Sequence, residues 1–151
     1  MGGALAIGWA RTGKHEVTVT ARTEQTLSRF AEVDNIRTST DNLNAVCGAD
    51  VVVLAVKPWL IEDVCGQIAG YLDFSRQIIL SVAANVFSDS LRGYLGCETA
   101  KVCYIMPNIA AEYGEAMTYL APAEGVTAEE TSLVRELLLE VGKVQVCKEK
   151  E

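Results

Sequence analysis

The chain has 151 residues, of which 50% are hydrophobic and 7% aromatic, and its formal net charge is -7 at pH 7. Its Lys and Arg residues are scattered, no apolar run reaches the roughly 20 residues of a membrane span, and the first residues lack a signal-peptide pattern. We therefore expect a cytoplasmic protein that has neither nucleic acid nor a membrane as a partner.

The predicted strands and helices alternate along the chain, which is typical of repeated βα units and a parallel sheet. The chain opens with a helical segment rich in small residues, 1–10, with no strand before it. The run 51–56 is apolar on both faces, so we expect it to be a central strand. In chain order, strands are predicted at 17–21, 36–38, 51–56, 77–82, 102–105, 117–120 and 143–147.

Helices are predicted between these strands. Thr23 can cap a helix over residues 24–32, and Asp41 can cap a short one that runs through Val46. Pro58 suits the first turn of the next helix, because apolar residues follow it at helical spacing.

The last helical pattern follows Thr127. We expect Gly142 to end this helix, and no repeat or linker in the sequence indicates a second domain, so one domain over 1–151 is expected. Another helix is predicted after Ser88. The apolar stripe of the last helix consists of Leu133, Val134, Leu137, Leu138 and Val141.

Cysteine and histidine residues indicate no metal site. The five cysteines form no C-x-x-C pair, so neither a disulfide framework nor a zinc site is predicted. Cys103 and Cys147 lie in apolar stretches and are interpreted as small buried hydrophobic residues. His15, the only histidine, lies in the polar segment 12–15, which favours a surface loop over a catalytic base.

The loop after the strand at 17–21 carries Arg22 and Thr23 and no acidic residue. In an open α/β sheet, ligands bind at the carboxyl ends of the strands. A domain for NAD places Asp or Glu at this strand end, whereas one for NADP places Arg, Ser or Thr to meet the 2′-phosphate. The loop therefore fits NADP, and a solvated arginine is an alternative of equal weight.

Three further loops follow predicted strands. Pro58 fixes a turn and keeps Lys57 out of the helical region, so the backbone can lie flat against a ligand. The small residues at 81–84 let a ring approach the backbone. Asn108, beside a proline, can orient a ligand or satisfy its own turn. Taken singly, each of these segments also fits an ordinary loop.

Together, these segments resemble the pyrroline-5-carboxylate reductase family. The family pattern runs through G-x-G-N-M-G-x-A, an asparagine, A-D-V-V-x-L-A-V-K-P, S-x-A-A-G, M-P-N and V-G-x-x-x-x-x-x-E. The match covers the whole chain in order, and A-V-K-P with M-P-N at this separation is a specific pair. The matching positions are 1–4, Asn42, 49–58, 81–84, 106–108 and Val141 through Glu149.

The resemblance implies a Rossmann-like α/β fold, a mostly parallel sheet flanked by helices. It implies NADP, with NAD as the other possibility, bound across the strand ends, and reduction of a small cyclic imine, 1-pyrroline-5-carboxylate, to proline. Asn108 would lie near the nicotinamide and the substrate. The implied cofactor contacts are Gly2, Arg22, Thr23, Asn42, Ala55, Val56, Lys57, Pro58, Ala83 and Ala84.

The sequence departs from the family pattern at three places. Asn85 stands where the family usually has glycine, although asparagine tolerates positive φ better than most residues. The first strand and the first two glycines are absent before Gly2. After Glu149 the family continues into a helical domain that supplies the dimer, the substrate pocket and a proton donor. We therefore expect no catalytic residue in this chain and a homodimer or larger homo-oligomer for the complete protein.

The absent first strand belongs between the strands at 17–21 and 51–56. We expect these strands to close up against one another, or another chain to insert a strand, or the missing segment to exist in the native protein. The same pattern also leaves other functions open. These are another reductase or dehydrogenase, such as prephenate dehydrogenase or an F420-dependent NADP reductase, and a truncated, non-catalytic nucleotide-binding domain.

Overall fold

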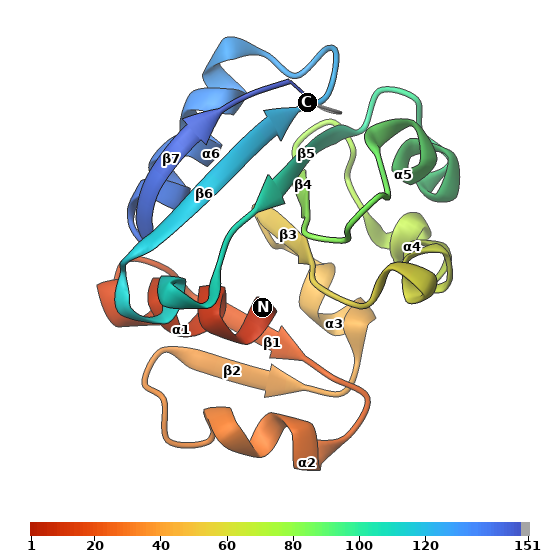
Figure 1. The fold of residues 1–151 in the computed structure, drawn as a ribbon. Coiled ribbons are helices and arrows are strands. Elements are labelled where there is room, and N and C mark those ends of the chain that lie inside the picture. Colours follow the sequence, from red (N-terminus) through yellow and green to blue (C-terminus); the bar gives the residue numbers. More distant parts are fainter. Residues whose placement is uncertain (149–151) are drawn as a thin grey trace.

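The computed structural model describes residues 1–148 and has an α/β fold (Figure 1). Glu149 lies outside the described residues. One sheet pairs β1 with β2, and the other has the order β3-β4-β5-β6-β7. All neighbouring strands are parallel except β5 and β6, which confirms a mostly parallel architecture. The strands are β1 (Val17–Thr20), β2 (Ile36–Ser39), β3 (Val51–Leu54), β4 (Ile78–Ser81), β5 (Lys101–Met106), β6 (Ala116–Pro122) and β7 (Gly142–Val146).

Helices connect the strands, and within residues 1–148 none of them combines the length and apolarity that crossing a membrane requires. The predicted caps are confirmed: the side chains of Thr23 and Asp41 accept hydrogen bonds from the backbone N–H groups of Thr26 and Leu43. The α-helices are α1 (Gly2–Thr12), α2 (Glu24–Leu27), α3 (Asn42–Val46), α4 (Ile61–Ile68), α5 (Ser88–Leu95) and α6 (Ala128–Leu139). Short 3-10 turns are η1 (Ser28–Phe30), η2 (Pro58–Leu60), η3 (Ala69–Tyr71) and η4 (Ile109–Tyr113).

Helix α1 joins the two sheets. Residues 4–10 are all buried, so the helix is covered on every side. Leu5 and Trp9 belong to the core of the five-stranded sheet, whereas Ile7 belongs to a smaller core with Phe30 beside β1 and β2. Figure 1 accordingly shows the N-terminus between the β1–β2 pair and the larger sheet.

Strand β3 is an edge strand of the five-stranded sheet, so the prediction of a central strand at 51–56 is wrong. Val51 and Val53 are half-buried, and only Val52 and Leu54 are buried. The strand that is buried at every position is β4, which has a partner on each side. An apolar run signals burial, but it does not say which strands pair.

Strands β1 and β3 do not pair with each other within the described residues. Closure of the two strands is therefore not the outcome that the structure adopts. Insertion of a strand by another chain and the presence of the missing segment in the native protein both stay predictions. In either case the inserted strand would satisfy the backbone groups along the facing edges of β1 and β3.

The predicted helix over 24–32 is shorter in the structure. Helix α2 ends at Leu27, and η1 continues only to Phe30. Both of these side chains are buried in the small core beside β1 and β2. Leu27 and Phe30 are three residues apart, a spacing that brings both side chains to one face in a 3-10 turn as in an α-helix.

Helix α6 also differs from its prediction. Leu133 is 52% exposed, so it does not belong to the buried stripe. Gly142 does not cap the helix but opens β7, where an added Cβ would lie 2.0 Å from the carbonyl oxygen of Ala116. This glycine is needed for the close approach of β6 and β7, because a side chain there would meet backbone. The fully buried stripe residues are Val134, Leu138 and Val141.

The interpretation of Cys103 as a buried hydrophobic residue is confirmed. Its side chain is fully buried, and burial raises the pKa of its thiol to about 12. Cys147 is only half-buried. His15 lies in the turn after α1, as predicted, but its Nε2 is 2.8 Å from a carboxylate oxygen of Glu140 and so ties this turn to the end of α6.

We expect Gly8→Ala to lower the free energy of unfolding by about 1 to 3 kcal/mol. The added Cβ would lie 2.3 Å from the Ala111 carbonyl oxygen and 2.8 Å from a Val141 methyl carbon. Gly66→Ala is the matched control, because Gly66 is also helical and nothing lies within 4 Å of the position of its Cβ. This control should be neutral or stabilise by up to about 1 kcal/mol. Equal effects in urea denaturation would contradict the close packing of α1 on η4.

We expect Glu130→Gln to cost about 0.5 to 1 kcal/mol of stability at neutral pH. Glu130 pairs with Lys101 and accepts a hydrogen bond from the backbone N–H of Thr127, and these contacts lower the pKa of Glu130, Lys101 contributing most. A carboxylate with a lowered folded-state pKa stabilises the fold above its unfolded pKa and loses that effect as the pH falls through the folded value. Glutamine keeps the capping box but not the charge.

The cost of Glu130→Gln should therefore disappear in acid, below the folded-state pKa of Glu130. Glu129→Gln, in the same first turn of α6, is the control for the general effect of removing an acidic charge. Thermal unfolding measured across the acidic range provides the comparison. A cost for Glu130→Gln that does not change with pH would contradict the role of its charge.

Candidate functional site

The carboxyl ends of three parallel strands define one edge of the five-stranded sheet. In the register of β3, β4 and β5, Leu54 pairs with Ser81, and Ser81 pairs with Tyr104. The segments that follow these strand ends therefore leave the sheet on the same side. This places Lys57, Ala83 and Asn108 after the carboxyl ends of adjacent strands, the arrangement expected of a ligand-binding edge.

The end of β1 is tied to this edge by side chains. Thr20, the last residue of β1, donates a hydrogen bond from its hydroxyl to Asn42 Oδ1 at 2.6 Å. Asn42 begins α3, and its Nδ2 donates to Gln67 Oε1 of α4 at 3.4 Å. The β1–β2 pair therefore contacts α3, and Asn42 links α3 to α4, although the pair has no strand pairing with the larger sheet. Arg22 follows directly after this connection.

The start of α1 touches the end of β3. An added Cβ on Gly2 would lie 2.7 Å from the Cβ of Ala55, a distance too short for any residue with a side chain. Gly2 thus allows the amino end of the helix to lie against the turn that follows β3. The amino end of a helix presents free N–H groups and a partial positive charge to this edge.

The turn after β3 has the predicted form. Lys57 has φ -59 and ψ 147, outside the helical region, and Pro58 opens η2. The backbone N–H of Leu60 donates to the Lys57 carbonyl oxygen at 2.9 Å, which closes the turn. Ala55 and Lys57 are exposed, whereas Val56 and Pro58 are half-buried. The turn therefore offers a small side chain and a cation to solvent.

The turn after β4 contains a residue in the left-handed region. Asn85 has φ 62, a conformation that glycine adopts without cost and asparagine at a small cost. The backbone N–H of Ala83 donates to the Ser81 hydroxyl at 3.3 Å. Ala83 is buried and Ala84 is exposed. Asn85 therefore adopts here a positive φ that asparagine tolerates better than most residues.

Two of the predicted site residues also serve their own turns. The Asn108 side-chain oxygen accepts a hydrogen bond from the backbone N–H of Ala110 at 3.1 Å and caps η4. The Thr23 hydroxyl caps α2. Arg22 is exposed, and residues 1–148 give its guanidinium no hydrogen bond or ion pair. Arg22 is therefore free to pair with an anion.

Among the predicted site residues, only Arg22 and Lys57 carry a charge, and both are cations. This edge can hold an anionic ligand, but its predicted residues include no acid or general base. Sequence reasoning missed Thr20 and Gln67, which fix the position of Asn42. Their partner lies 22 and 25 positions away along the chain, so no local pattern could have revealed the contacts.

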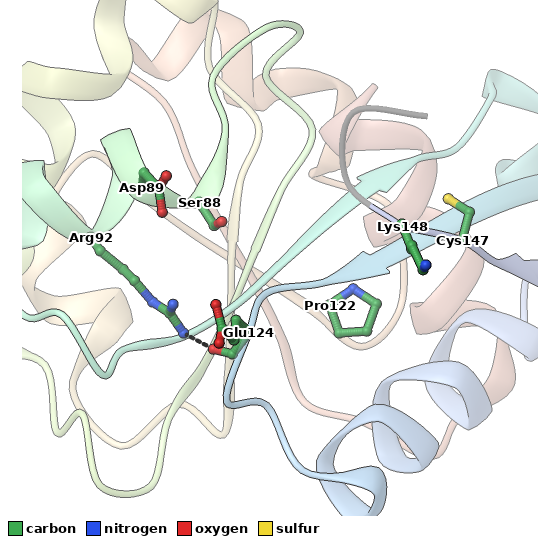
Figure 2. A pocket seen from close by; sticks show the side chains of 7 residues that line it. All are labelled: Ser88, Asp89, Arg92, Pro122, Glu124, Cys147 and Lys148. Atoms are coloured by element: carbon green, nitrogen blue, oxygen red, sulfur yellow. Dashed lines mark hydrogen bonds between the residues drawn. The ribbon is translucent and has the colours of Figure 1, made fainter.

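Two cavities of the described residues lie away from this edge. One cavity has a volume of about 440 Å³ and is lined by Arg92, which donates to the Glu124 carbonyl oxygen at 2.8 Å. Figure 2 shows this cavity with its lining side chains. Pro122, in its wall, pairs with Cys103 near the start of β5, at the opposite end of that strand from Asn108. A second cavity, of about 530 Å³, lies between α1 and the region of η1. Neither cavity is lined by a residue predicted to bind the cofactor.

Known proteins resemble the whole chain. The family model described as NADP oxidoreductase, coenzyme F420-dependent, matches residues 1–85. Pyrroline-5-carboxylate reductase of Vibrio alginolyticus is 34% identical over 128 residues, which cover 85% of this chain and 46% of that protein. The solved structure of pyrroline-5-carboxylate reductase from Coxiella burnetii has a TM-score of 0.88 at 27% identity. The match covers 99% of this chain and 56% of that one.

The fold likeness extends to more distant structures. Plasmodium falciparum pyrroline carboxylate reductase, solved with NADP bound, has a TM-score of 0.84 at 21% identity, and the match covers 99% of this chain and 55% of that one. The chain spans about half the length of the curated relatives it matches. The resemblance found in the sequence is confirmed by these matches. The chain therefore belongs to the NADP oxidoreductase, coenzyme F420-dependent family and is a relative of the pyrroline-5-carboxylate reductases.

Proposed function

We propose that this chain is the cofactor-binding domain of an NADP-dependent reductase that converts 1-pyrroline-5-carboxylate to proline. The observation that carries the proposal is the shared edge where the A-V-K-P turn after β3 and the M-P-N turn after β5 leave the sheet. These two motifs are the specific pair of the reductase pattern, and the Vibrio relative bears that name. A cytoplasmic location is part of the same proposal.

The residues present fit a phosphorylated dinucleotide. Arg22 is exposed and has no partner in the described structure, and no acidic residue stands beside it to hold a free ribose diol. Asn42 is held by two side-chain hydrogen bonds, so its amide is fixed at the same edge. Ala55 and Ala84 are small and exposed, which leaves room for a ligand against the backbone. Gly2 keeps the start of α1 close to this edge.

When bound, NADPH would supply a hydride to the imine carbon, and the imine nitrogen would take up one proton, giving proline and NADP⁺. The part played by this chain is to hold and orient: Arg22 and Thr23 at the adenosine end, the 55–58 turn and the 83–84 turn along the edge, and Asn108 beside the substrate. We assign the proton donor, the walls of the substrate pocket and the glycine-rich loop to parts of such a reductase that this chain does not span, since it covers about half the length of its curated relatives.

A preference for NADP over NAD provides one test of this assignment. Arg22→Ala in the complete protein should weaken NADPH binding about tenfold to a hundredfold, because a charge-assisted hydrogen bond contributes about 1.5 to 3 kcal/mol. NADH binding should change little. Arg37→Ala, which removes another exposed arginine from β2, is the control for loss of positive charge. Equal losses for both cofactors, measured by titration calorimetry, would show that Arg22 does not discriminate between them.

Activity of the isolated chain provides a second test. We expect the 151-residue chain to show no measurable reduction of 1-pyrroline-5-carboxylate, whereas the protein extended at both ends should turn over. Hydride transfer needs the imine held against the nicotinamide, and loss of such positioning can cost several kcal/mol of barrier lowering. The rate of NADPH oxidation, followed by absorbance at equal protein concentration, compares the two proteins.

Two results of this assay would count against the proposal. Comparable turnover by the short and extended proteins would mean that the active site lies elsewhere in this chain. Reduction of coenzyme F420, with no turnover of the cyclic imine by the extended protein, would assign it to the other activity named in the family description.

A further inference from the structure

Trp59 is the most exposed of the large hydrophobic side chains in the described residues, with 75% of its surface accessible. The other tryptophan, Trp9, is 7% exposed, and its indole N–H donates to the Leu137 carbonyl oxygen at 2.9 Å. Leaving an indole ring in water forgoes the free energy of burying it. Exposed tryptophans of this kind are enriched at binding sites, where a ligand covers the ring.

A rigid turn presents Trp59 to solvent. Pro58 fixes the start of η2, and the hydrogen bond from Leu60 N–H to the Lys57 carbonyl oxygen closes it. Ile61, directly after the turn, is fully buried and anchors it to the core beneath α4. Because the backbone that carries the ring is already fixed, ligand binding costs little additional backbone conformational entropy at this turn.

The turn lies at the part of the edge where the proposed adenosine site begins. Hydrogen bonds through Asn42 tie the end of β1, which leads to Arg22, to Gln67 near the end of α4, and η2 lies at the start of the same helix. Gly2 brings the start of α1 against Ala55, four residues before Trp59. The 57–59 turn follows the carboxyl end of β3 and the Arg22 turn follows the carboxyl end of β1, so a nucleotide that lies across this edge can meet both turns.

We propose that Trp59 stacks on the adenine ring of the dinucleotide and so sets the affinity for the adenosine end. The inference rests on the proposed cofactor function. Adenine has a flat π-face, and stacking on an aromatic side chain is worth about 1 to 3 kcal/mol per base. Together with the cation of Arg22 on the 2′-phosphate, the ring would make the adenosine half the main anchor of the cofactor on this chain.

Adenosine 2′,5′-bisphosphate is the probe that tests this inference on the 151-residue chain. It carries the base and the 2′-phosphate but needs neither the pyrophosphate loop nor the substrate pocket. By calorimetry, Trp59→Ala should weaken its binding about fivefold to a hundredfold, and Trp59→Phe should retain most of the affinity. Tyr94→Ala, which removes another exposed ring from the last turn of α5, should have no effect.

Ribose 2,5-bisphosphate, which lacks the base, separates stacking from a general loss of the site. Its binding should be the same for wild type and Trp59→Ala. Tryptophan fluorescence gives an independent signal: the adenosine probe should quench emission in wild type but not in Trp59→Phe, where only Trp9 remains.

The outcomes distinguish the inference from the function on which it rests. Unchanged binding of the adenosine probe by Trp59→Ala, with a clear loss for Arg22→Ala, would overturn stacking and leave the cofactor proposal standing. Binding that does not depend on Arg22, or no binding by wild type, would contradict the cofactor proposal and the stacking together.

Discussion

The packing of α1 is the constraint on which the rest of the structure depends. The two sheets share no strand pairing in the described residues, so the buried helix between them, together with the Thr20–Asn42–Gln67 hydrogen bonds, sets how they meet. Its side chains enter the cores of both sheets, and Gly8 allows the backbone of η4 to approach within contact distance. The candidate site draws Arg22 from one sheet and Ala55, Ala83 and Asn108 from the other. A shift of α1 would therefore separate the two halves of the site.

This arrangement explains the composition of the first segment. A helix that is covered on every side has no polar face, and its small residues permit close approach where larger ones would collide. Gly2 and Gly8 each meet atoms that a methyl group would overlap. The same helix begins at the edge proposed to hold the phosphates of the cofactor. Close packing against the two sheets and binding of an anionic ligand therefore require the helix to lie in the same place.

Much of the fold is predictable from the sequence because apolar runs and caps are local signals. All the predicted strands are present, and Thr23 and Asp41 cap helices as expected. The wrong predictions concern which strands are neighbours in the sheet and which side chains face the core. The run at 51–56 is apolar enough for a central strand, yet its neighbours in the sheet are decided by distant residues. Leu133 has the right spacing for the stripe of α6 but faces solvent, because the stripe is narrower than its periodicity suggests.

The candidate site was predictable to the extent that strand ends define it. Parallel register brings the turns after β3, β4 and β5 to one edge without further information, and the positive φ of Asn85 is one that asparagine tolerates. No local sequence pattern predicts the Thr20–Asn42–Gln67 hydrogen bonds. No local pattern predicts the exposure of Trp59 either, because an indole beside a proline turn is equally consistent with burial under the following helix.

The most direct test of the central claim is a map of where NADP⁺ binds, made by titrating the isotope-labelled chain and following its backbone amide resonances. If the dinucleotide lies across the carboxyl edge, the shifts should be concentrated at 22–23, Asn42, 55–57 and 83–85, even at weak affinity. The amides of Arg92 and Glu124, beside the cavity in Figure 2, should not move. Shifts confined to that cavity, or none at the strand ends, would contradict the account.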